Sequence, residues 1–271
     1  MFAWLRRRRR ARIKAAPFPP KWRSILESRV PYYRLLPPRD RAELEGHIAV
    51  FLAEKRFEGL QGQEITDEVR VTIAAQACIL LLHRDTDYYP GLKSILVYPR
   101  RYLATGRTVG PGGIVTESTG VRLGESWHGV LSTRGPGPVV LSWDDVRAGA
   151  ADPRDGANVV FHEFAHQLDG ESGSVEGAPL LEHGSLYATW ARVFSAEFER
   201  LRIDLAWDRS TLLGAYAATS PAEFFAVATE FFFERPSALR ARHPALYAQL
   251  AAFYRQDPAQ LEAPSNPSPG P

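Results

Sequence analysis

The sequence predicts an α+β protein in which a helical N-terminal part precedes short strands and then a second series of helices. Apolar residues recur at helical spacing up to about residue 85, and runs typical of strands, bounded by glycine and proline, follow from residue 94. Helical spacing returns after residue 158. Strands first and helices later favour an α+β unit over alternating βα units. The chain has 271 residues, 45% of them hydrophobic, which is enough to form a substantial core.

The helical part is expected to span residues 21–85. One helix is predicted from Pro38 to about Phe57, because an apolar stripe recurs at helical spacing. The stripe consists of Leu44, Ile48, Phe51 and Leu52. Asp67 can cap a second helix from about residue 68 to 83, whose centre is strongly apolar. Cys78 lies in that centre; as the only cysteine it cannot form an internal disulfide, and it is expected to be a buried apolar residue.

Both ends of the chain are predicted to be disordered. Residues 1–20 form a basic arm with seven basic residues and no acidic residue before position 15, although the net charge of the whole chain is only +2. Such an arm could contact nucleic acid or an anionic membrane surface. A solvated terminus is the simpler interpretation, and nucleic-acid binding is not favoured. Residues 259–271 are rich in proline and serine and predict a disordered tail.

No segment predicts export or stable membrane insertion. A signal peptide would need an apolar run of roughly 7–15 residues after the basic stretch, but charge and proline interrupt residues 11–20. No stretch approaches the roughly 20 apolar residues that span a bilayer. A cytoplasmic protein is therefore expected.

The remaining region, residues 86–258, is expected to form the α+β domain. Strands are predicted at 94–98, 120–123 and 139–143. A helix capped by Asp155 or Asn158 should end near Gly170, and a polar, glycine-rich loop follows it. Further helices are predicted at 185–202, 221–234 and 244–255.

The helix that ends near Gly170 contains the pattern His-Glu-x-x-His, formed by His162, Glu163 and His166. Residues four apart lie on one face of a helix, so both imidazoles can reach a single metal ion. Neutral imidazole is a good zinc ligand, and the glutamate can take a proton from a metal-bound water. Burying these groups among apolar neighbours is costly unless something binds them. The alternative is a pair of hydrogen-bonded core histidines.

A catalytic zinc site usually has three protein ligands, and the residues leave the third one open. A third histidine shortly after the first two is excluded, because Asp169 and Ser172 occupy the positions that this longer motif needs. Glu223, 57 positions after His166, is the leading candidate. Ser220, Pro221 and Glu223 also form a capping box, which would explain the glutamate without a metal. The competing candidates are Glu230, His183, Asp169 and Glu171.

Three segments resemble the Mlc titration factor A family of bacterial zinc peptidases. They are His162–Asp169, Tyr216–Phe233 and Pro138–Asp144. The resemblance extends from near Phe51 to Pro258 and leaves the basic arm and the proline-rich tail outside. The same motif, with Tyr216 seven positions before Glu223, also resembles the catalytic domain of anthrax lethal factor.

The resemblance implies a zincin-like (gluzincin) metallopeptidase domain with one catalytic Zn²⁺, acting as an aminopeptidase or an endopeptidase. His162, His166 and Glu223 would be the ligands. Glu163 would be the general base and Tyr216 the donor to the oxyanion. By analogy, the strand ending at Trp143 could bind an extended peptide through its edge. The family also implies a sugar-responsive transcriptional repressor as partner, so the alternative function is a regulatory binding protein with a latent or weak peptidase site.

Overall fold

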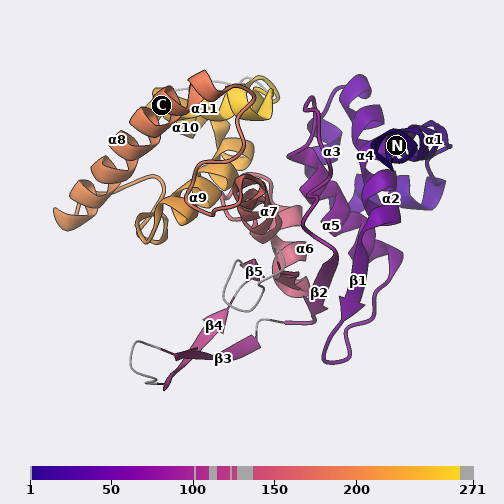
Figure 1. Cartoon of the computed structure of the whole chain (residues 1–271), viewed down its shortest axis with the longest axis horizontal. Coiled ribbons are helices and arrows are strands. Elements are labelled where there is room, and N and C mark those ends of the chain that lie inside the picture. The colour runs from indigo at the N-terminus through magenta and orange to yellow at the C-terminus, as the bar shows by residue number, and fades with distance from the viewer. Residues whose placement is uncertain (1, 101, 110–114, 123, 127–136, 263–271) are drawn as a thin grey trace, which may run out of the picture.

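The computed structural model describes residues 2–100, 102–109, 115–122, 124–126 and 137–262. Two groups of helices lie on either side of helix α7 (Val159–Asp169), and a small sheet lies below the N-terminal group (Figure 1). The architecture is therefore α+β, as the sequence predicts. No helix in the described ranges is long and apolar enough to cross a membrane.

Helix α5 is the centre of the N-terminal group. The group comprises α1 (Phe2–Ala15), α2 (Pro20–Arg29), α3 (Pro31–Leu35), α4 (Pro38–Glu54) and α5 (Asp67–Ile79). Every residue from Val71 to Ile79 is buried, because α2, α4 and α7 pack around this helix. Thr66, and not the predicted Asp67, caps it by accepting a hydrogen bond from the Val69 N–H at 3.3 Å. Cys78 is buried, as expected.

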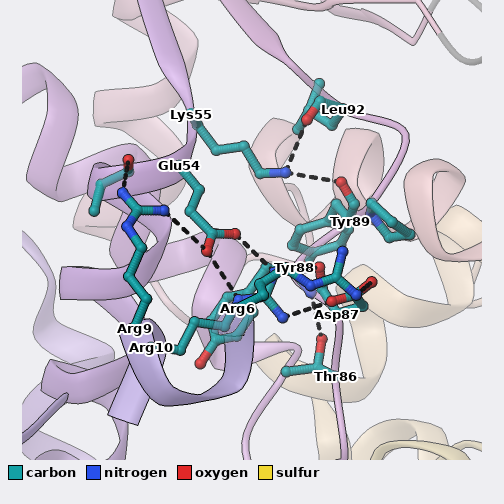
Figure 2. Close-up of polar contacts among 12 residues, drawn as sticks. Arg6, Arg9, Arg10, Glu54, Lys55, Thr86, Asp87, Tyr88, Tyr89 and Leu92 are labelled. Carbon is teal, nitrogen blue, oxygen red and sulfur yellow. Dashed lines mark hydrogen bonds and ion pairs between the residues drawn. The ribbon is translucent and has the colours of Figure 1, made fainter. Parts of the chain in front are cut away.

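The prediction of a disordered basic arm is wrong for residues 2–15, which form helix α1 against α4. Arg10 donates two hydrogen bonds to the carboxylate of Glu54, at 2.9 and 2.8 Å, and one to Asp87 at 2.5 Å (Figure 2). Next to this pair, Lys55 donates to two backbone carbonyls, at 2.8 Å each. Acidic side chains from distant parts of the chain therefore neutralise one face of the helix.

The main sheet has the strand order β1-β2-β6-β5. Its strands are β1 (Arg56–Gly59), β2 (Ser94–Tyr98), β6 (Val139–Ser142) and β5 (Gly124–Ser126). β1, β2 and β6 run parallel, with Phe57 opposite Ile95, and β5 runs antiparallel to β6. Since β1 belongs to the predicted helical part, the sheet crosses the expected boundary at residue 85. A separate hairpin, β3 (Tyr102–Val109) with β4 (Val115–Arg122), covers most of the predicted strand 120–123, whose last residue lies outside the described ranges.

The position of β6 corrects the expected site of peptide binding. All four residues of β6 are buried, and the strand lies between β2 and β5, so neither of its edges is free. Trp143 does not extend the strand but begins helix α6 (Trp143–Ala151), which Ser142 caps. Among the described strands, β5 forms the edge of the sheet on this side, and it packs against α7.

Four helices form the C-terminal group: α8 (Tyr187–Ala206), α9 (Pro221–Glu234), α10 (Pro236–Arg242) and α11 (Pro244–Tyr254). Aromatic side chains fill the space between them, including Trp190 stacked on Phe194 with ring centroids 4.0 Å apart. The chain then forms a short turn of 3₁₀ helix at Pro258–Gln260. Of the predicted disordered tail, residues 263–271 lie outside the described ranges.

Candidate metal centre

Helix α7 carries the His-Glu-x-x-His motif, and Asn158 fixes where the helix begins. The Asn158 side chain accepts hydrogen bonds from the N–H groups of Val160 and Phe161, at 3.1 and 3.0 Å. It therefore satisfies two of the helix's otherwise unpaired donors. The other predicted cap, Asp155, instead accepts from the Ala157 N–H at 2.8 Å.

The two histidines lie on the same face of α7, as the spacing predicts. The ring centroids of His162 and His166 are 4.9 Å apart with the rings nearly perpendicular. Phe164, between them in the sequence, points the other way and packs on Tyr89 at 4.8 Å. The helix is therefore anchored by an aromatic core on one side and presents imidazole nitrogens on the other.

Glu223 on α9 brings a carboxylate to both histidines. Its Oε2 lies 2.9 Å from Nε2 of His162 and 3.4 Å from Nε2 of His166. Ser220 caps α9 by accepting from the Glu223 N–H at 3.2 Å, so the backbone of Glu223 takes part in the cap while its side chain turns to the histidines. Glu223 can therefore belong to the capping box and still be a candidate metal ligand. His162, His166 and Glu223 offer ligand atoms within 4.8 Å of one another, a donor set that suits zinc.

Glu230 lies behind His162. Its Oε1 is 2.8 Å from Nδ1 of His162, and its Oε2 accepts from the Asn158 N–H at 2.6 Å. A carboxylate only accepts hydrogen bonds, so Nδ1 carries a proton, and when the ring is neutral the lone pair of Nε2 faces Glu223. Histidine ligands of metals are commonly held in this way by an outer carboxylate. Glu230 is thus placed to orient a candidate ligand.

The electrostatics of this cluster favour a positive charge between its carboxylates. Burial opposes the charged form of His162, yet hydrogen bonds to Glu223 and Glu230 raise its pKa to about 10. Burial would also raise the pKa of Glu223, but hydrogen bonds from His162 and His166 hold that pKa well below its usual range. A bound metal ion would supply the same positive charge in place of the proton.

Glu163 and Tyr216 complete the set of predicted site residues. Glu163 follows His162 on α7, and the residue is only 3% exposed. Tyr216 lies on a short 3₁₀ turn (Tyr216–Ala218), is 58% exposed, and places its ring centroid 5.8 Å from that of His162. Partial burial and the charge of Glu223 raise the pKa of Tyr216, so its hydroxyl stays protonated and can donate.

Asp169, another acidic candidate for the third ligand, lies outside the metal cluster. Asp169 is fully buried and accepts from the N–H groups of Gly177 and Ala178, at 2.7 and 2.8 Å. It ties the loop after α7 to the end of that helix. Gly177 has a positive φ of 77°, and a Cβ there would lie 2.4 Å from the carbonyl oxygen of Pro221 at the start of α9. The loop 176–178 therefore joins the two helices that carry the cluster. The remaining candidates for the third ligand, Glu171 and His183, do not belong to the cluster of His162, His166 and Glu223.

A buried polar network behind the cluster was not predicted from the sequence. Glu234 accepts from the Asn158 side chain at 2.9 Å and from the Gly156 N–H at 3.1 Å, and Gln76 accepts from the same Asn158 amide at 2.8 Å. Burial raises the pKa of Glu234 to about 9. Its spacing from Glu223 and Glu230, eleven and four positions, placed it on their helical face and could have indicated the network.

A groove of about 420 Å³ opens beside the start of α9. Its walls are mainly apolar and aromatic, with acidic side chains at the rim. They include Trp190, Phe194, Phe198, Phe224, Glu176 and Glu199. Pro221 and Phe224, which flank Glu223 in the sequence, both line the groove.

Comparison with known proteins agrees with this chemistry. The model of the glucose-regulated metallo-peptidase M90 family matches residues 3–255, so helix α1 belongs to the matching region, contrary to the expectation from sequence. The uncharacterized protein slr2042 of Synechocystis sp. is 41% identical over 89% of this chain and 86% of its own length. Mlc titration factor A of Klebsiella pneumoniae (strain 342) is 33% identical over 85% of this chain and 84% of its own. Mlc titration factor A of Salmonella arizonae is 32% identical over 85% of this chain and 89% of its own length.

Such a family implies a metal cofactor, and the cluster of two histidines and a glutamate fits one. The chain belongs to the glucose-regulated metallo-peptidase M90 family.

Proposed function

We propose that the protein is a zinc-dependent peptidase with His162, His166 and Glu223 as the metal ligands. One observation carries the proposal: a single carboxylate oxygen of Glu223 lies within 3.4 Å of both Nε2 atoms. Family membership supports the peptidase class. Two imidazoles and one carboxylate are the ligand set of many catalytic zinc sites, which keep a fourth position open.

When bound, the zinc ion would polarise the scissile carbonyl and lower the pKa of a water molecule. Glu163 would accept the proton of that water at its carboxylate and later pass it to the leaving amine. Tyr216 would donate its phenolic hydrogen to the oxygen on which negative charge develops. Glu230 would keep the Nε2 lone pair of His162 directed at the ion.

We also propose that the domain is zincin-like and that its substrate is an extended peptide alongside β5. β5 runs antiparallel to β6, is an edge strand among those described, and packs on the helix that carries the motif. An edge strand offers backbone hydrogen bonds to an extended chain. The groove beside α9 would take an apolar side chain of that peptide, because aromatic residues form its walls and Pro221 and Phe224 flank a proposed ligand.

A second function is supported by the names of the relatives. Mlc titration factor A is named for titrating Mlc, and proteins of that name match most of this chain. We propose that this protein also binds a sugar-responsive transcriptional repressor, with peptide hydrolysis as a separate property of the metal site. A Glu163→Gln protein that still binds such a repressor but hydrolyses no peptide would separate the two functions.

The decisive experiment measures zinc content and peptide hydrolysis in the wild type, Glu163→Gln and Glu223→Ala. The proposal expects hydrolysis by the wild type only, with zinc retained in Glu163→Gln and weakened in Glu223→Ala. Zinc that binds equally well to Glu223→Ala would remove Glu223 from the ligand set. A zinc-loaded wild type that cleaves no peptide across a broad substrate panel would leave repressor binding as the function.

A further inference from the structure

We propose that Asp40, Glu43 and His83 form a second binding site for a divalent transition-metal ion, separate from the His-Glu-x-x-His cluster. Asp40 and Glu43 are one turn apart on α4, and His83 lies in the turn that follows α5. Nε2 of His83 is 3.0 Å from Oδ1 of Asp40 and 4.0 Å from Oε2 of Glu43. The three ligand atoms lie within 4.8 Å of one another.

The hydrogen bond on the other side of the His83 ring decides what its Nε2 can do. Nδ1 lies 3.0 Å from the backbone carbonyl of Arg255, and a carbonyl oxygen can only accept. Nδ1 therefore carries a proton. In the neutral ring, Nε2 then directs a lone pair at two carboxylates, an arrangement that needs a cation between them. A metal ion meets that need, and a second proton on the ring is the competing solution.

The two carboxylate oxygens of Glu43 have different partners, and this leaves one oxygen for the ion. Oε1 accepts from the His83 N–H at 2.8 Å and lies 3.3 Å from Nε2 of His47. Oε2 is the atom that faces Nε2 of His83. The chain thus holds one oxygen in place and directs the other towards the imidazole.

The geometry parallels that of the first cluster. There, Nε2-to-oxygen separations are 2.9 and 3.4 Å, and the outer nitrogen of His162 is held by Glu230. Here the separations are 3.0 and 4.0 Å, and the outer nitrogen of His83 is held by a carbonyl. Tetrahedral zinc with ligand distances of about 2.0–2.1 Å separates its ligand atoms by about 3.3 Å. In both clusters the Nε2-to-oxygen separations lie on either side of that value, and small side-chain rotations would reach it.

The ligand types define the ion. Imidazole with carboxylates suits Zn²⁺ and its first-row neighbours, whereas Ca²⁺ and Mg²⁺ prefer oxygen ligands alone. The side chains of His83, Asp40 and Glu43 are 34%, 15% and 28% exposed, so solvent can reach the site and complete the coordination. An ion bound here would link α4 to the turn after α5, which itself contacts Arg255 at the end of α11. We therefore expect it to stabilise the fold.

The test counts zinc after equilibrium dialysis against Zn²⁺, by elemental mass spectrometry. His83→Asn is the main variant, because asparagine tolerates the left-handed backbone of this position (φ 62°) and is a poor ligand for zinc. The wild type should bind two zinc ions per chain and His83→Asn one. His183→Ala, which changes another exposed histidine outside both clusters, should still bind two.

A His162→Ala/His166→Ala background makes the result independent of the first cluster. In that background one zinc ion should remain, zinc should raise the melting temperature, and adding His83→Asn should remove both effects. Equal zinc content with and without His83→Asn in this background would overturn the proposal and leave the protonated ion pair as the explanation of the cluster. Circular dichroism of each variant shows that it is folded.

Discussion

Glu230 and Glu223 lie on opposite sides of the same imidazole. Oε1 of Glu230 is 2.8 Å from Nδ1 of His162, and Oε2 of Glu223 is 2.9 Å from Nε2. Both glutamates belong to α9, two turns apart, so one helix provides a candidate ligand and the group that orients another. The geometry of the proposed metal site therefore depends strongly on how α9 packs against α7.

Glu230→Gln should weaken zinc binding without abolishing it. A neutral amide is a poorer acceptor for Nδ1–H, and loss of such an outer partner typically costs about 10–100-fold in metal affinity or activity. Competition with a chromophoric chelator measures the affinity. Glu27→Gln, an exposed change on α2, is the matched control and should bind zinc like the wild type. Unchanged affinity in Glu230→Gln would show that the contact does not tune the site.

Tyr216→Phe should lower kcat while zinc content stays the same. Removing one donor to a developing oxyanion typically costs about 10²–10³ in rate. Because Tyr216 is 58% exposed, loss of its hydroxyl should leave the melting temperature close to that of the wild type. Steady-state kinetics on a peptide substrate is the measurement, and a kcat within twofold of the wild type would exclude the proposed role.

Glu234 should make the protein less stable as pH rises. Burial raises its pKa from 4.5 in the unfolded chain to about 9 in the fold, so the native state binds the proton more tightly. The stabilisation is complete below about pH 4.5 and is lost as the pH rises towards 9. The unfolding equilibrium constant should grow by up to about tenfold per pH unit in that window. Urea unfolding at pH 5.5, 7 and 8.5 measures the slope, which should be shallower in Glu234→Gln. Equal slopes in the two proteins would contradict the assignment.

Ser195→Trp should block the groove beside α9. Ser195 lines the groove and is exposed, so an indole there would occupy space without disturbing the buried core. We expect KM to rise about tenfold or more for peptides with a large apolar side chain, equivalent to about 1.4 kcal/mol of lost binding. Zinc content should not change. Ser195→Ala is the control. If KM rose by a similar factor for peptides that contain only small side chains, the binding site for the apolar side chain would lie elsewhere.

Arg10→Ala should destabilise the protein by about 1–3 kcal/mol, because partly buried Glu54 loses two charge-assisted hydrogen bonds and keeps only a longer, 3.7 Å ion pair with Arg9. Arg7→Ala, on an exposed position of the same helix, should change stability by no more than about 0.5 kcal/mol. Chemical denaturation of the two variants gives the comparison. Equal effects would mean that helix α1 is held by something other than the Arg10 ion pairs.

Sequence periodicity was sufficient for α7 and α9 because their signals are local. His162 and His166 share a face at any position where the chain is helical, and Ser220 marks the start of α9 independently of the rest of the fold. Sequence spacing also ranked Glu223 above its rivals. Spacing could not separate the proposed ligand from the proposed orienting residue, because the proposed roles of Glu223 and Glu230 depend on which nitrogen of His162 each one reaches.

The errors came from contacts between distant segments. Seven basic residues without an acid predict a solvated arm, but Glu54 and Asp87 lie 44 and 77 positions away from Arg10 and neutralise it. Strand β6 was expected to have a free edge because its own residues do not reveal its neighbours. β6 is completely buried because it lies between β2, about 45 residues earlier in the chain, and β5, about 15 residues earlier.

The loop 176–178 has a consequence for how the protein responds to metal supply. Asp169 holds Gly177, whose backbone lies against Pro221, so the distance between α7 and α9 is set by main-chain contact and hydrogen bonds. The spacing of the proposed ligands on α7 and α9 would thus be set without the ion, unlike in a zinc finger, which folds only around its metal. Loss of zinc from the proposed site would then stop peptide hydrolysis without unfolding this part of the protein, and zinc could bind there again without refolding.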